Sequence, residues 1–138
     1  KGIFMYKKIE KFLQIFFMCH CRADRSFFYK GKKFPICARC TGELIGILTA
    51  IPMAFIIKDL NWFYIIILSL PLILDGFIQL LTTYESNNLK RVITGFLFGI
   101  AFVYIFLKYH YFALKISLNI IENIQPNNPI LEKYKEFL

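Results

Sequence analysis

The four cysteines of this 138-residue chain form two closely spaced pairs, Cys19-x-Cys21 and Cys37-x-x-Cys40. A CxxC pair places two thiolates within reach of a single ion, and a second pair one loop away completes a tetrahedral set of sulfurs. His20 offers an imidazole in the same loop, although adjacent residues rarely both reach one metal. The spacing therefore predicts a metal–thiolate site made by the four cysteines, with His20 as a further candidate ligand.

Zinc is the ion that we expect at this site, and iron or copper are the alternatives. The basic residues around the cysteines favour the metal-binding thiolate form, because positive charge lowers the pKa of a thiol. These residues are Arg22, Arg25, Lys30, Lys32, Lys33 and Arg39. A redox-active thiol pair and inert buried cysteines are the other interpretations of the pattern.

Two acidic residues fall inside apolar segments and could take part in chemistry. Asp75 lies within LSLPLILDGFIQLL, where an ionised carboxylate is costly unless it is paired. Gln79 lies four residues further on, on the same helical face. Asp75 could act as an acid–base group, or it could pair with an arginine that holds helices together. Glu43 could ligate the metal, act as a base or pair with an arginine of the loop, and we rank the pairing first.

A third polar cluster connects the second and third apolar segments. Glu85, Asn87 and Asn88 could cap helix ends, which is a structural role. Arg91 and Thr94 follow one turn apart on one face of the next helix. An anion such as phosphate could dock there, because the N-terminus of a helix favours negative charge.

The composition requires a membrane around these residues. The chain is 57% hydrophobic, with a mean hydropathy of +0.53, and it contains 16 Phe and 8 Tyr. That is more apolar surface than a soluble domain of this size can bury, so the excess must face lipid. The net charge of +8 would suggest nucleic acid in a soluble protein. We exclude that partner, because no basic recognition helix or stacking platform accompanies the charge.

The expected fold is an all-α membrane protein with a single domain over residues 1–138. The segments that we expect to span the bilayer are residues 41–57, 62–83 and 92–107. Before them we expect an interfacial helix over 1–18 and the cysteine loop over 19–40. After them comes an amphipathic tail over 108–138.

The start of this tail admits two interpretations. It could extend the third helix or lie on the membrane surface.

The distribution of positive charge predicts the orientation of the chain. Residues 1–40 contain ten Lys or Arg against two acids, whereas the tail after Leu107 contains four Lys against three acids. The positive-inside rule therefore places the N-terminus and the cysteine loop in the cytoplasm of a multi-pass cell-membrane protein. Thiols on that side stay reduced, which disfavours disulfides. No small-residue cleavage site follows the first residues, so we expect no cleavable signal peptide.

Two pairs of glycines predict close helix packing. Gly42 and Gly46 begin the first apolar segment, and Gly95 and Gly99 begin the third. Each pair has the GxxxG spacing, which allows helix backbones to approach closely within a membrane. We expect the bundle to be tightest at the end that carries these glycines.

Three stretches of the chain, CHCRADRSFFYKGKKFPICARCTGELIG, LPLILDGFIQ and ESNNLKRVITGFLFG, together resemble a family of small prokaryotic membrane proteins known only as a domain of unknown function. The resemblance covers about residues 18–99 and follows the order C-H, R-S-F, F-P-x-C-x-R-C-x-G, D-G-x-x-Q and E-S-x-N-x-x-R-x-x-T-G. The matching positions are Cys19, His20, Arg25, Ser26, Cys37, Arg39, Cys40, Gly42, Asp75, Gly76, Gln79, Glu85, Ser86, Asn87, Arg91, Thr94 and Gly95. The resemblance implies no activity.

Cys21 departs from the family pattern, in which a glutamine stands at this position. The resemblance therefore implies that the core ligands are Cys19, Cys37 and Cys40. The fourth place would go to His20, Asp75 or a group from outside the protein. Three protein ligands and one open position are typical of a catalytic metal site, whereas four close the site.

Three functional hypotheses follow. The first is a membrane-embedded metalloenzyme in which Asp75 or Glu43 serves as acid–base and an anionic, lipid-linked substrate is bound. The substrate-binding candidates are Arg25, Ser26, Arg39, Gln79, Glu85, Asn87, Arg91 and Thr94. The second is a non-catalytic subunit or adaptor of a larger membrane complex, with a structural zinc site. The third is a metal or ion carrier, which the apolar outer halves of the spans disfavour unless the chain forms a homo-oligomer.

Overall fold

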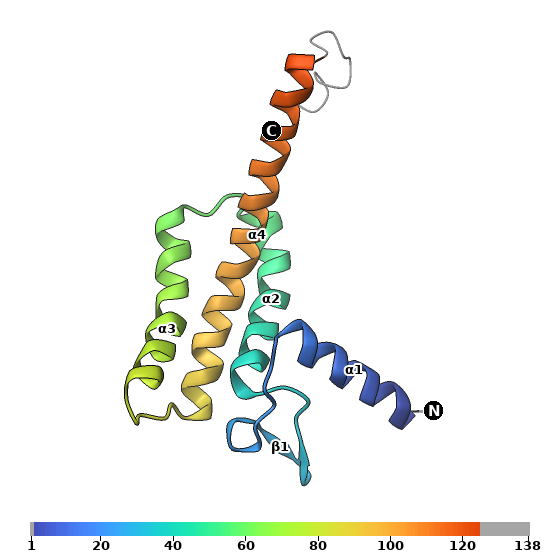
Figure 1. Ribbon diagram of the computed structural model, residues 1–138, viewed down its shortest axis with the longest axis vertical. Helices are drawn as coiled ribbons and strands as arrows, with labels where there is room; N and C mark the ends of the chain where they lie inside the picture. The colour runs from blue at the N-terminus through green and yellow to red at the C-terminus, as the bar shows by residue number, and fades with distance from the viewer. Residues whose placement is uncertain (1, 125–138) are drawn as a thin grey trace. The chain divides into compact units, whose positions relative to one another are not determined.

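The computed structural model describes residues 2–124, which are mostly helical (Figure 1). The predicted all-α architecture is confirmed. Three of its helices are long and apolar enough to cross a membrane. In chain order the elements are α1 Gly2–Phe16, the 3-10 turn Ala23–Arg25, β1 Phe28–Tyr29, β2 Lys32–Lys33, α2 Ala38–Ile56, α3 Trp62–Leu81 and α4 Asn88–Ile124.

Helix α4 is longer at both ends than the segment that we expected. It begins at Asn88 because the side chain of Asn87 accepts a hydrogen bond from the Lys90 amide, at 2.9 Å, and so caps the first turn. It ends at Ile124, so the start of the tail extends the third helix. A helix of this length is about 55 Å long, well beyond the hydrocarbon thickness of about 30 Å. The remaining tail, including its predicted amphipathic end, lies outside the described residues.

The chain divides into two compact units within α4. Val103 ends the first unit, which also contains α1, α2 and α3, and Tyr104 begins the second. The polar residues of the candidate site described below all belong to the first unit.

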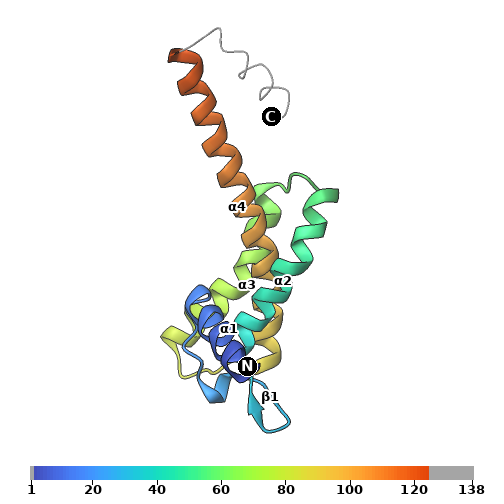
Figure 2. The same cartoon turned by 90° about the vertical axis from the view of Figure 1, so that its right-hand side faces the viewer.

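Helices α2 and α4 lie with their backbones in contact, and the glycine pairs are the reason (Figure 2). A Cβ atom on Gly42 would overlap the backbone of Val92, and one on Gly95 would overlap the backbone of Arg39. A Cβ atom on Gly46 would come within 3.0 Å of the Gly99 Cα atom. The predicted close packing is therefore confirmed, and it brings the start of α2 against the start of α4.

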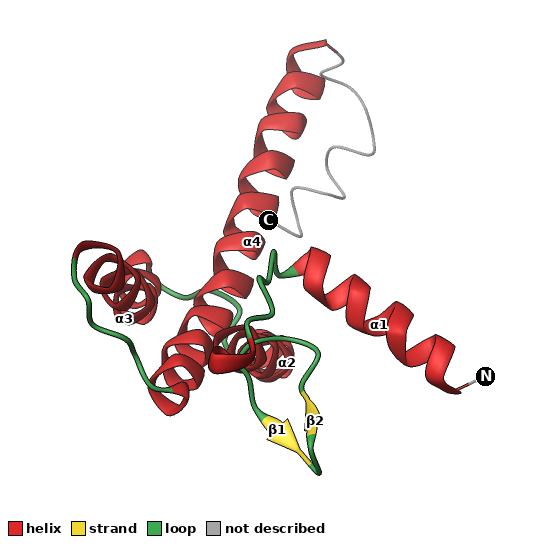
Figure 3. Cartoon of the chain, turned by 60° about the horizontal axis from the view of Figure 1, so that its bottom comes forward, coloured by secondary structure: helices red, strands yellow, loops and turns green. Residues whose placement is uncertain are grey.

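The loop between α1 and α2 contains a small β-hairpin that the sequence did not predict (Figure 3). Strands β1 and β2 pair antiparallel, with Phe28 opposite Lys33 and Tyr29 opposite Lys32. Lys30 and Gly31 form the turn, both with positive φ, of 49° and 74°. Two consecutive positive φ values are typical of the two-residue turns that connect hairpin strands.

Helix α1 carries exposed apolar side chains, among them Phe12 and Phe16. The side chain of Gln14 in α1 donates a hydrogen bond to the carbonyl of Pro35, at 3.2 Å, which connects the helix to the cysteine loop. The location of α1 at the membrane interface stays a prediction.

Candidate metal centre

Three cysteine sulfurs come together at the start of α2. The Sγ atoms of Cys19, Cys37 and Cys40 all lie within 4.8 Å of one another, so the group could hold a metal ion. Cys37 caps α2 and Cys40 lies in its first turn, which places their sulfurs 3.4 Å apart. Cys19 reaches them from the end of α1, and its sulfur accepts a hydrogen bond from the Cys37 amide at 3.2 Å.

The environment of Cys37 favours its thiolate. The hydrogen bond with Cys40 is the main cause, and it lowers the pKa of Cys37 to about 5. Burial acts in the opposite direction, but a second hydrogen bond with Cys19 adds to the lowering. A thiolate is the form of cysteine that binds metal, so Cys37 is prepared for coordination at neutral pH.

Cys21 lies outside the sulfur group. Its thiol donates hydrogen bonds to the carbonyls of Cys19 and Pro35, at 3.3 and 3.4 Å. Burial is the main reason that the pKa of Cys21 is raised to about 11. Spacing alone predicted one site made by all four cysteines. In the structure three sulfurs lie close together, and the fourth is hydrogen-bonded to the backbone.

The two other candidates for the fourth ligand also lie outside the group. His20 is exposed. Asp75 is occupied by Arg39, with which it forms an ion pair, and by Gln79, whose Nε2 donates a hydrogen bond to it at 2.7 Å. Within residues 2–124 the sulfur group therefore includes no fourth cysteine, histidine or carboxylate.

The Arg39–Asp75 pair agrees with one of the two interpretations of the buried acid. Arg39 stands between the two cysteines of α2, and Asp75 belongs to α3. The Asp75 side chain is only 11% exposed. In this structure Asp75 pairs with an arginine that joins two helices, and it is not a free acid–base group.

Glu43 differs from what we expected. We ranked pairing with an arginine of the loop first, but Arg25 bonds to Glu85 at 3.3 Å and Arg39 pairs with Asp75. In the described part of the chain no hydrogen bond or ion pair involves Glu43, although it has an electrostatic interaction with Cys37. This half-buried carboxylate, one turn beyond Cys40, is the free acid beside the thiolates.

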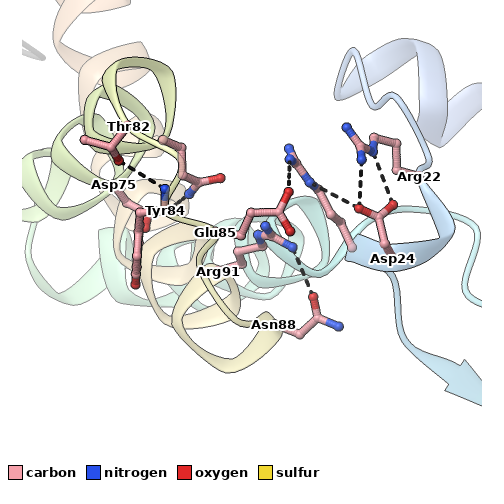
Figure 4. A network of polar contacts seen from close by, with 10 residues as sticks. Arg22, Asp24, Asp75, Thr82, Tyr84, Glu85, Asn88 and Arg91 are labelled. Carbon is pink, nitrogen blue, oxygen red and sulfur yellow. Dashed lines mark hydrogen bonds and ion pairs between the residues drawn. The ribbon is translucent and has the colours of Figure 1, made fainter.

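Together with Ser26, Arg91 is the most deeply buried of the predicted anion-binding residues. It is 4% exposed, and its Nη1 donates a hydrogen bond to Asn88 at 3.4 Å (Figure 4). Arg25 and Arg39 lie close enough to repel it, and Glu85 and Asp75 lie close enough to attract it. The structure thus brings Arg25, Arg39, Asp75, Glu85 and Arg91 into one electrostatic network.

Three of the predicted binding residues are occupied by local backbone contacts. The Ser26 hydroxyl donates to the carbonyl of Arg22 at 2.7 Å, and the Thr94 hydroxyl donates to the carbonyl of Arg91 at 3.2 Å. Asn87 is the cap of α4. Ser86, which we did not include among the binding residues, is 3% exposed and lies beside this cap. Its place in the E-S-x-N motif was the signal that could have found it.

The helices and the cysteine group define an integral membrane protein with three apolar helices and a cluster of cysteines that could bind a metal ion. The chain belongs to the family described as "Predicted membrane protein (DUF2085)", whose model matches residues 19–105. The match begins at Cys19 and includes α2, α3 and the first half of α4. It confirms the resemblance to a family of unknown function.

Two archaeal proteins are similar to this chain. An uncharacterized protein of Methanothermobacter thermautotrophicus is 39% identical over 88 residues, which cover 61% of this chain and 79% of that protein. An uncharacterized protein of Methanocaldococcus jannaschii is 40% identical over 93 residues, which cover 63% of this chain and 60% of that protein. No solved structure matches the chain.

Proposed function

We propose that this protein is a membrane-embedded metalloenzyme that acts on an anionic, lipid-linked substrate. In this proposal Cys19, Cys37 and Cys40 hold a zinc ion whose fourth position is open to water or substrate. The observation that carries it is the gathering of three sulfurs within 4.8 Å while Cys21 is hydrogen-bonded to backbone carbonyls. Three protein ligands and one exchangeable position are typical of catalytic zinc.

The residues beside the thiolates suit such a reaction. Zinc supplies Lewis acidity and lowers the pKa of a bound water. Glu43 is the proposed base that accepts the proton of that water, since its carboxylate has no ion pair among the described residues. Asp75 is proposed as a positioning residue that holds Arg39, because the ion pair already occupies its carboxylate.

Substrate binding is assigned to the three arginines of the electrostatic network. Arg25, Arg39 and Arg91 supply positive charge, which suits an anion. Cys37 and Cys40 lie at the N-terminal end of α2, and Arg91 lies at that of α4. Both are apolar helices long enough to cross a membrane. A substrate with a lipid tail could reach this end of the bundle from the bilayer, and the positive-inside rule places it on the cytoplasmic side.

X-ray absorption spectroscopy of the zinc-loaded protein tests the open position. We expect three sulfur neighbours at about 2.3 Å and one nitrogen or oxygen neighbour at about 2.0–2.1 Å. In the cobalt-substituted protein, added imidazole should shift the visible absorption bands by entering the open position. Four sulfur neighbours, or bands that imidazole does not change, would contradict the proposal.

A Glu43→Gln variant tests the role of the proposed base. The variant should bind cobalt as the unchanged protein does, because Glu43 is not a ligand. The pH at which the visible bands change should shift, because the carboxylate that interacts with the bound water is gone. A variant that loses its metal would instead make Glu43 a ligand, and an unchanged pH profile would remove Glu43 from the reaction.

The second candidate is a structural zinc site in a subunit or adaptor of a membrane complex. It is favoured by the bond between the Cys19 sulfur and the Cys37 amide, which already joins the end of α1 to the start of α2. A zinc ion there would fasten the whole loop to the bundle. This candidate requires a closed site, and the absorption experiment would then find four sulfur neighbours that include Cys21.

A further inference from the structure

Two polar side chains at the start of α4 are buried and incompletely bonded. Arg91 is 4% exposed, and its Nη2 has no hydrogen-bond partner among the described residues. Ser86 is 3% exposed, and its hydroxyl likewise lacks a partner in that part of the chain. Ser86 directly precedes the capping residue Asn87, and Arg91 lies one turn beyond it, so both stand at the same end of the helix.

The charges around Arg91 leave one positive charge without a close partner. Arg39 is ion-paired with Asp75, and Arg25 bonds to Glu85 at 3.3 Å. Among the described residues no carboxylate lies within ion-pair distance of Arg91. A buried guanidinium without a counter-ion is costly, and so is a buried hydroxyl without a hydrogen bond.

The N-terminus of α4 also attracts negative charge. Backbone amides and the helix dipole give a helix N-terminus a partial positive charge that attracts anions. The guanidinium of Arg91, the hydroxyl of Ser86 and the end of the helix are therefore all donors of hydrogen bonds. A tetrahedral phosphate can accept several such bonds at once, and arginine matches its geometry well.

We propose that Ser86, Arg91 and the N-terminus of α4 bind a phosphate group. The inference extends the proposed function by naming the anionic part of the substrate, and the binding itself requires no metal. The phosphate could come from a lipid headgroup or from free phosphate in solution, because both offer the same oxygens. Glu85 borders the site but is held by Arg25, so its charge is largely compensated.

Binding of two probes tests this site. In the first experiment, inorganic phosphate is titrated into the full-length protein in detergent, and isothermal calorimetry measures binding. In the second, lipid phosphorus NMR compares the protein in nanodiscs that contain phosphatidic acid with the protein in nanodiscs of pure phosphatidylcholine. We expect saturable binding of at least one probe. Binding of phosphate alone supports a free anion, and binding of phosphatidic acid alone supports a headgroup.

The variants separate the site from general positive charge. Ser86→Ala should weaken binding by about 5-fold and Arg91→Lys by about 10-fold, as expected for hydrogen bonds to a charged group. Arg22→Gln removes a positive charge from the loop between α1 and α2, where Arg22 is exposed and paired with Asp24 at 3.0 Å. That control should change binding by less than about 2-fold.

Ser86→Ala removes only one oxygen atom, so the variant should keep its fold, and circular dichroism checks this. The test therefore does not depend on the arginine variant alone. Absence of saturable binding of both probes would overturn the inference. Equal losses in Ser86→Ala, Arg91→Lys and Arg22→Gln would also overturn it. Phosphate binding should persist in Cys37→Ser. A protein that binds phosphate but no metal would therefore refute the metal function while supporting this site.

Discussion

Arg39 and Asp75 form an ion pair that connects the cysteine motif of α2 to α3. Arg39 lies between Cys37 and Cys40 in the sequence, and its side chain attaches this part of the cysteine motif to α3. Gln79 holds the same carboxylate from the next turn of α3. The metal group and the helix packing are thus parts of one arrangement.

Replacing Asp75 with asparagine should destabilise the bundle and leave the metal content unchanged. The amide cannot compensate the charge of Arg39, whereas the sulfurs are placed by the start of α2. We expect a loss of about 1–3 kcal/mol, less than for a fully buried pair because the Arg39 side chain is 28% exposed. Denaturant unfolding in detergent measures the loss, and elemental analysis measures the metal.

The exposed pair of Arg22 and Asp24 provides the control for this variant. Asp24→Asn should have no measurable effect on unfolding, because solvent screens that interaction. The double variant Arg39→Gln/Asp75→Asn should be less destabilised than the sum of the two single variants. Strict additivity would show that the pair contributes nothing.

Gly46→Ala should destabilise the protein although alanine is the better helix former. Alanine normally gains about 1 kcal/mol over glycine within a helix. At Gly46 the added Cβ would meet the backbone of Phe96, so the helices must move apart. We expect a net loss of about 2 kcal/mol, measured by thermal unfolding.

Gly76 on α3 is the matched control, since a Cβ atom there would have no neighbour within 4 Å. Gly76→Ala should leave the unfolding temperature unchanged or raise it. Equal effects at Gly46 and Gly76 would contradict the close contact of α2 and α4.

Removal of the metal should open the cysteine loop to protease. The proposed ligands lie on both sides of the hairpin, so the ion would close the loop between Cys19 and Cys37. Chelation with 1,10-phenanthroline should accelerate tryptic cleavage after the exposed residues Lys30 and Lys32. Mass spectrometry of the fragments measures the rate of this cleavage. Cys37→Ser should be cleaved rapidly with or without chelator. An unchanged rate in the unsubstituted protein would argue against a metal in the loop.

The sequence predicted the helices and their packing because both depend on local patterns. Apolar length identified the three spans, and the GxxxG spacing identified the contact of α2 and α4. The end of α4 was left open, because Lys108, Lys115 and Glu122 interrupt the apolar pattern. Such residues can continue a helix once it has left the hydrocarbon. The hairpin was not predicted, because strands of two residues are too short to show a period.

The sequence located the cysteine group but could not separate its members. Spacing makes Cys21 as good a ligand as Cys19. The difference arises because the backbone turns at Cys21, with a positive φ of 50°, and its thiol meets the carbonyl of Pro35. Only the departure of Cys21 from the resembled family pattern indicated this difference.

The pairing of the acids likewise required the structure. An arginine partner was expected for Glu43 and was one of two interpretations for Asp75. The choice depends on which helix faces Arg39, and sequence spacing does not contain that information. The ion pair that reaches from α2 to α3 occupies Arg39 with Asp75, and Glu43 is left without a hydrogen bond or ion pair among the described residues.

Metal content of the purified protein and of its single cysteine variants shows whether Cys19, Cys37 and Cys40 hold a metal ion without Cys21. We expect about one zinc ion per chain in the unsubstituted protein and in Cys21→Ser, measured by inductively coupled plasma mass spectrometry. We expect loss of the ion in Cys19→Ser, Cys37→Ser and Cys40→Ser. Loss of metal from Cys21→Ser to the same extent as from Cys37→Ser, or no metal in any form of the protein, would contradict the three-cysteine site.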